Sequence, residues 1–147
     1  MRGYENDVYG FDLDVCNRQG ILFESSQLYD KYPCDAEDFV TKFMKSDFAK
    51  DMDGELSNCH VWGDQQFFDE IFLSYTVKPF DETRFINPDI MYWIGYLTRY
   101  WNFWLGTSSE EIITKFPFTK LVNAYGLHTV GPQEAIQQLI LGRVSNP

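Results

Sequence analysis

The chain has 147 residues and a formal net charge of −10. This length suits a single domain, which should bury roughly 70% of its unfolded surface. Apolar residues make up 44% of the chain and aromatic residues 18%, which excludes intrinsic disorder. The acidic excess argues against a general nucleic-acid binder, because neutralising phosphates requires a basic surface.

The charge is unevenly distributed along the chain. Residues 1–87 carry 8 basic and 18 acidic side chains, whereas residues 88–147 carry 4 of each. Two interpretations stay open: the acidic half serves solubility alone, or it forms a surface that meets a basic partner.

The cysteine usage indicates a reducing compartment. The chain has three widely spaced cysteines, Cys16, Cys34 and Cys59. Their odd number implies no disulfide framework, and the N-terminal residues lack the apolar run of a signal peptide. We therefore expect a cytoplasmic location.

The first elements predicted are two short strands. Apolar residues alternate with aspartates from Phe11 to Val15, which is the period of a strand. Residues 17–20 carry a turn signal, and the apolar residues 21–23 follow it. These patterns predict a small β-hairpin within residues 1–24, as an appendage.

Helical patterns then run through residues 35–141, which we expect to form the helical body of the domain. Apolar residues recur there with the spacing of one helix face, and capping residues and prolines separate the segments. The predicted helices cover residues 35–53, 64–77, 88–106, 107–116, 117–125 and 132–141. Within the first of these, two interpretations stay open: Ser46 and Asp47 cap a second short turn, or the helix continues through Phe48 and Ala49.

The segment 88–106 is predicted to be the central helix. Asn87 suits the N-cap, Pro88 the first helical position and Gly106 the left-handed C-terminal position. Apolar groups lie nearly all round this helix, which is typical of a buried helix or of one with a second face for a partner. Its apolar run is too short for a membrane span, and Arg99 lies near its middle.

Arg99 is the sharpest single candidate in the sequence. It shares a helix face with Tyr92 and Tyr96, and arginine and tyrosine dominate interface hot spots. One interpretation is therefore an anchor for a partner. The other is an internal ion pair that holds the central helix to an acidic neighbour.

Residues 108–125 have the parts of a helix-turn-helix, with Thr119, Lys120 and Asn123 as candidate DNA contacts. A packed helical pair without DNA is the competing interpretation, because basic residues are scarce there. No catalytic, metal-binding or cofactor motif is evident, and the only histidines are His60 and His128.

Four segments form an ordered series: DFVTKFMKSD at 38–47, YWIGYLTRYW at 92–101, GTSSEEI at 106–112 and YGLHT at 125–129. This series resembles a group of small bacterial proteins encoded beside predicted ADP-ribosyltransferase-like toxins. The resemblance covers residues 35–141 and implies the antitoxin side of such a locus. It supplies no catalytic residue.

Together these observations predict a single, mainly α domain: a compact bundle around the helix 88–106. We expect a non-enzymatic protein that binds a basic protein partner and needs neither cofactor nor membrane. The alternatives are a DNA-binding autorepressor and an enzyme that reverses ADP-ribosylation. The expected partner-binding residues are Tyr92, Tyr96, Arg99, Tyr100 and His128.

Overall fold

The computed structural model describes residues 7–28, 33–54 and 58–142. These residues are mainly helical, which confirms that part of the predicted fold class, and they contain no β-strand. The α-helices are α1 (Phe11–Ser25), α2 (Ala36–Lys45), α3 (Asp47–Met52), α4 (Asp64–Ser74), α5 (Pro88–Leu105), α6 (Ser109–Lys115), α7 (Phe118–Asn123) and α8 (Pro132–Ile140). Three short 3₁₀ helices connect them: η1 (Asn58–Val61), η2 (Glu82–Arg84) and η3 (Tyr125–Thr129).

Helix α5 is the central helix, and its ends are those predicted from the sequence. The Asn87 side chain accepts a hydrogen bond from the Asp89 amide at 2.8 Å, and Pro88 occupies the first turn. Gly106 ends the helix with φ of 73°, a left-handed conformation that favours glycine. No helix in the described part of the chain is long and apolar enough to cross a membrane.

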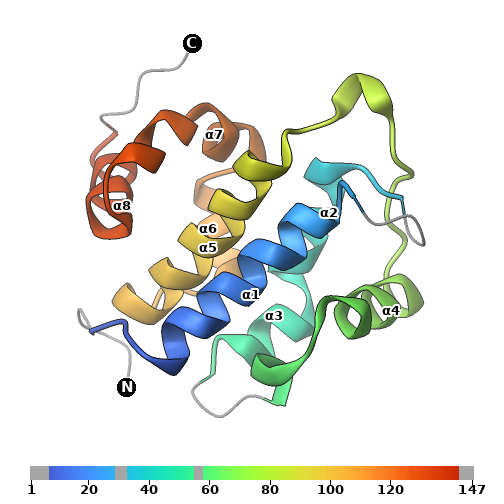
Figure 1. The fold of residues 1–147 in the computed structure, drawn as a ribbon, viewed down its shortest axis with the longest axis horizontal. Helices are drawn as coiled ribbons and strands as arrows, with labels where there is room; N and C mark the ends of the chain where they lie inside the picture. The colour runs from blue at the N-terminus through green and yellow to red at the C-terminus, as the bar shows by residue number, and fades with distance from the viewer. Residues whose placement is uncertain (1–6, 29–32, 55–57, 143–147) are drawn as a thin grey trace.

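Helix α1 lies along α5 over much of its length (Figure 1). The two backbones approach most closely where Gly20 faces α5 and Gly95 faces α1. A Cβ atom on Gly95 would lie 2.5 Å from the carbonyl oxygen of Gln19, and one on Gly20 would lie 2.8 Å from the Tyr92 ring. This contact therefore requires the absence of a side chain at both positions.

The predicted N-terminal hairpin is wrong for the described part of that segment, because α1 occupies it; residues 1–6 lie outside the described residues. Val15, Cys16, Leu22 and Phe23 are all buried, at the spacing of one helix face. Gly20, which lies in the expected turn, forms the close contact with α5. The apolar residues of this segment fit both the period of a strand and that of a helix, and packing against the central helix selects the helix.

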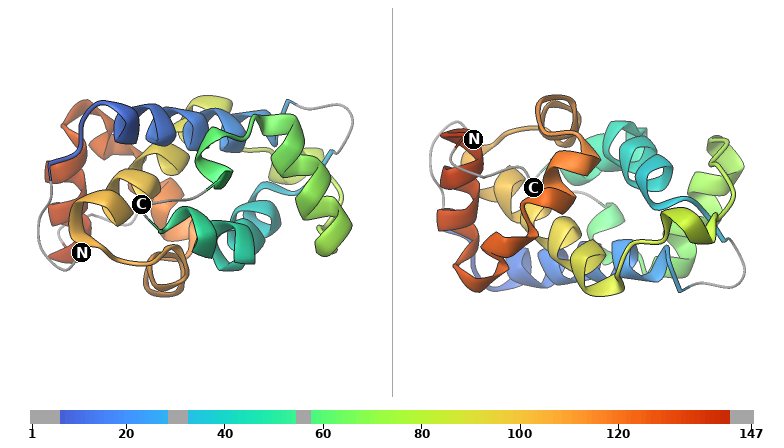
Figure 2. Two further views of the ribbon diagram at one scale, coloured as in Figure 1. Left: turned by 90° about the horizontal axis from the view of Figure 1, so that it is seen from below. Right: turned by 90° about the horizontal axis from the view of Figure 1, so that it is seen from above.

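The remaining helices complete the bundle around this pair. Of the two interpretations at Ser46, the break is the one present: α2 ends there, and the Ser46 hydroxyl accepts a hydrogen bond from the Ala49 amide to begin α3. Phe39 and Phe43 of α2 pack against Phe23 of α1. Helices α4 and α8 lie at opposite ends of the long axis (Figures 1 and 2).

Candidate partner-binding groove

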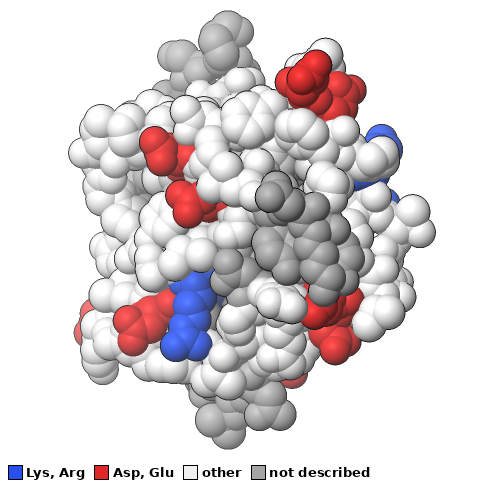
Figure 3. All heavy atoms as spheres, turned by 45° about the vertical axis from the view of Figure 1, so that its right-hand side comes forward, with Lys and Arg blue, Asp and Glu red and all other residues white. Residues whose placement is uncertain are grey.

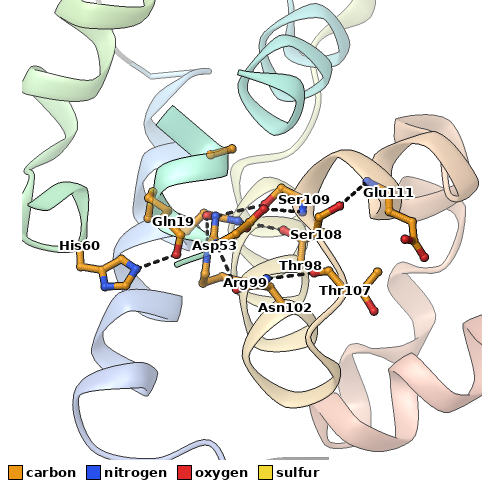
Figure 4. A network of polar contacts seen from close by, with 12 residues as sticks. Gln19, Asp53, His60, Thr98, Arg99, Asn102, Thr107, Ser108, Ser109 and Glu111 are labelled. Atoms are coloured by element: carbon orange, nitrogen blue, oxygen red, sulfur yellow. Dashed lines mark hydrogen bonds and ion pairs between the residues drawn. The ribbon is translucent and has the colours of Figure 1, made fainter. Parts of the chain in front are cut away.

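Arg99 has no exposed surface and lies in a buried polar network (Figure 4). Its Nη1 atom donates to Asp53 Oδ1 at 2.8 Å, and its Nε atom donates to Gln19 Oε1 at 2.8 Å. The prediction that Arg99 anchors a partner is therefore wrong, because a partner cannot reach the guanidinium. The competing interpretation, an internal ion pair, describes the structure.

Four elements meet in this network. Arg99 comes from α5, Gln19 from α1 and Asp53 from the end of α3. The first residue of α6, Ser109, donates to the Asp53 carboxylate from both its amide, at 2.9 Å, and its hydroxyl, at 2.7 Å. Burial lowers the pKa of Arg99, and the Asp53 carboxylate opposes that effect. The network thus joins α1, α3, α5 and α6 inside the bundle.

Tyr100 is also a core residue, contrary to its predicted role at an interface. Its side chain is 8% exposed, and its hydroxyl accepts a hydrogen bond from Gln133 Nε2 at 3.1 Å. It therefore joins α5 to α8. Tyr96 is partly buried, with its ring between those of Tyr92 and Tyr100 at centroid distances of 6.1 and 6.4 Å.

Two predicted partner-binding residues, Tyr92 and His128, come together at the surface. They line an open groove of about 550 Å³ between α1, α5 and η3. We call this surface the α1–α5–η3 groove; its lining residues are Asn17, Ile21, Glu24, Asp89, Tyr92, Trp93, Tyr125 and His128. The Tyr92 hydroxyl donates to Asn17 Oδ1, which fixes this ring across the two helices.

The rings of the groove form a corner. Tyr125 and His128 stack in parallel, with centroids 4.3 Å apart and planes at 5°. The Trp93 ring stands against Tyr125 at 83° and 5.7 Å. His128 Nδ1 donates to the Tyr125 carbonyl oxygen at 2.7 Å, so the imidazole is held in place. Fixed aromatic surfaces of this kind suit an interface, because little side-chain entropy is lost on binding.

The groove carries negative charge. Glu24 and Asp89 line it, and among the described residues no lysine or arginine does. Burial, together with the charge of nearby Glu24, raises the pKa of Tyr92, so its phenol stays protonated at neutral pH. The arrangement therefore favours a cation in contact with aromatic rings.

The candidate DNA contacts lie elsewhere. Thr119, Lys120 and Asn123 are exposed on α7, and two of them line a smaller pocket of about 250 Å³ with Phe85 and Ile86. The Lys120 ammonium lies 5.2 Å from the Phe116 ring centroid. Helices α6 and α7 present two lysines and two glutamates, so they form no basic patch.

Sequence reasoning missed most of the groove. Asn17 and Glu24 lie in the segment predicted to be a hairpin. They share one helix face with Ile21, and a hairpin prediction does not place these three residues together. Tyr125 precedes His128 by three residues, which is the spacing of a 3₁₀ turn, so the sequence did carry a signal that these two rings lie together.

Within the described ranges, no group of three or more His, Cys, Asp or Glu side chains could hold a metal ion.

The chain was compared with known protein families, with curated proteins and with solved structures, and none of these comparisons gives a match.

Proposed function

We propose that this protein is a non-enzymatic binding protein that takes a basic protein partner on the α1–α5–η3 groove. The observation that carries the proposal is the meeting of four aromatic or imidazole rings with two carboxylates in one groove, which no lysine or arginine of the described ranges lines. Large rings supply contact area, and complementary charge steers a partner and fixes its orientation.

The overall charge supports the same partner chemistry. The net charge of −10 attracts a basic protein at long range, most strongly at low ionic strength. On the face shown in Figure 3, however, acidic side chains lie in separate groups and not in one continuous patch, and one group lies beside basic side chains. Charge on that face would therefore speed the approach of a partner, whereas the groove would provide specific contacts.

The resemblance to antitoxin-like proteins extends this proposal to a particular partner, a toxin encoded by the neighbouring gene. Neutralisation would then occur by occlusion, because a partner held over the groove has part of its own surface covered. The two alternative functions, an autorepressor and an enzyme that reverses ADP-ribosylation, stay predictions.

The test is co-expression with the product of the neighbouring gene. We expect a stable complex at about 50 mM salt, slower association at higher salt, and restored growth of cells that express the neighbour. Absence of both the complex and the growth rescue would overturn the proposal.

A variant of the groove makes this test specific. The double variant Glu24→Gln/Asp89→Asn should bind the neighbour more weakly, whereas Glu110→Gln, on an exposed carboxylate of α6, should bind as the original protein does. Equal weakening by both variants would assign the effect to net charge and not to the groove.

A further inference from the structure

We infer that the α1–α5–η3 groove is a receptor for one arginine side chain of the partner, with the guanidinium against the rings and between the two carboxylates. This inference rests on the proposed binding function and names the group that the groove recognises. It is argued from the ring geometry, the charges and the supporting contacts of the groove.

The ring geometry favours a planar cation. Tyr125 and His128 present stacked rings 5° from parallel, and Trp93 stands nearly perpendicular to Tyr125. A guanidinium is flat and weakly hydrated, so it stacks on an aromatic face, whereas an ammonium is a compact and strongly hydrated charge. An aromatic corner therefore discriminates in favour of arginine over lysine.

The carboxylates supply the second half of the recognition. Glu24 is partly buried on α1, Asp89 is exposed in the first turn of α5, and both line the groove. Neither forms an ion pair with a lysine or arginine among the ion pairs found in the described residues. A guanidinium has five N–H donors in a fixed fork and can reach a carboxylate while its face contacts a ring.

The groove can be compared with an arginine site within the chain, where one buried and one exposed carboxylate bind a guanidinium. Asp35 and Glu37 already hold Arg84, with N–O distances of 2.7 Å to each. That pair of carboxylates shows how two acidic side chains from one surface hold a single guanidinium. In the α1–α5–η3 groove the carboxylates are present and the arginine would come from the partner.

The groove is also built to keep its shape. The Tyr92 hydroxyl donates to Asn17 on α1, and the His128 imidazole donates to the backbone of Tyr125. Gly20 and Gly95 hold α1 and α5 at close contact beside it. A receptor that is already ordered loses little entropy when the side chain enters.

The test uses three tripeptide amides, Gly-Arg-Gly, Gly-Lys-Gly and Gly-citrulline-Gly, titrated into the isotopically labelled protein. The indole N–H signal of Trp93 is followed by NMR, with Trp62, Trp101 and Trp104 as internal references. We expect the arginine peptide to shift the Trp93 signal at millimolar concentration, the lysine peptide to bind several-fold more weakly, and the neutral citrulline peptide to cause no shift.

Variants identify the carboxylates. Glu24→Gln and Asp89→Asn should each weaken the arginine peptide about two- to fivefold, and Glu110→Gln should not change it. A Trp93 shift of equal size with the citrulline peptide, or no shift with the arginine peptide at about 20 mM, would overturn the inference. A stable complex with the neighbouring gene product that excess arginine peptide does not weaken would also overturn it, while leaving the proposed binding function intact.

Discussion

The guanidinium of Arg99 and the carboxylate of Asp53 form an ion pair of 2.8 Å between residues 46 positions apart in the chain. Arg99 is fully buried, and the Asp53 side chain is 14% exposed. A charge in such a place is stable only with a partner, because desolvation of an unpaired ion costs several kcal/mol or more. The pair therefore makes the folding of α3 and α5 interdependent.

Removing the acidic member should destabilise the fold strongly. In the Asp53→Ala variant, Arg99 loses its counter-charge and the Ser109 amide loses its acceptor. We expect the free energy of unfolding to fall by about 3–5 kcal/mol, measured by urea denaturation with circular dichroism. The control is Glu110→Ala, which removes an exposed pair of 4.0 Å with Lys50 and should change stability by less than about 0.5 kcal/mol.

The contrast between α5 and α1 shows what the sequence could and could not predict. Helix α5 was predicted with its ends, because Asn87, Pro88 and Gly106 act locally on the backbone. Helix α1 was mistaken for a hairpin, since it has no side-chain cap at its start and its apolar residues fit two periods. Its helical form depends on contact with α5, which is a tertiary effect.

The candidate site shows the same limit. Tyr92 and His128 were identified from their residue types and segments, but their meeting in one groove depends on how η3 packs beside α5. For Arg99 the sequence left two interpretations, because a helix that is apolar nearly all round does not reveal which face is covered. Burial decided between them.

The close contact between α1 and α5 predicts that one added methyl group at Gly95 lowers the stability of the fold. In Gly95→Ala the new Cβ would lie 2.5 Å from the Gln19 carbonyl oxygen, so the helices must move apart. Alanine favours a helix by about 1 kcal/mol over glycine, yet we expect a net loss of about 2 kcal/mol or more. Thermal unfolding followed by circular dichroism measures the change.

The matched control is Gly126→Ala in η3, where a Cβ atom would have no atom within 4 Å. This variant should keep the stability of the original protein within about 0.5 kcal/mol. If both alanine variants are equally stable, close approach at Gly95 is not required by the fold.

His60 should make stability depend on pH. Burial lowers the pKa of its imidazole below 6.5, and its Nε2 atom donates to the Met52 carbonyl oxygen at 2.7 Å. The imidazole therefore takes up a proton at a higher pH in the unfolded chain than in the folded chain. Its contribution to the free energy of unfolding is fully present above about pH 6.5 and is lost as the pH falls toward the pKa of the folded state. Urea denaturation between pH 7.5 and 5 measures this loss.

The variant His60→Gln should remove that dependence, since glutamine retains an N–H donor but does not titrate. Asp35, whose pKa is lowered chiefly by its hydrogen bond with Arg84, contributes only in a more acidic window, below about pH 4. An unchanged slope between pH 7 and 5 in His60→Gln would show that another group is responsible.

Two tyrosines on α5 should separate binding from stability. Tyr92 is partly exposed in the groove, whereas Tyr100 is 8% exposed and accepts a hydrogen bond from Gln133. Truncating a buried aromatic residue leaves a cavity, and we expect Tyr100→Ala to lower the free energy of unfolding by about 3–5 kcal/mol. Tyr92→Ala should cost less stability but weaken the complex with the neighbouring gene product about tenfold or more, since tyrosine is a common hot-spot residue. Calorimetric titration and urea denaturation of both variants provide the comparison.

One outcome would contradict binding at the groove. If Tyr92→Ala binds the neighbouring gene product normally, whereas Tyr100→Ala is folded but does not bind it, the interface lies nearer α8 than the groove.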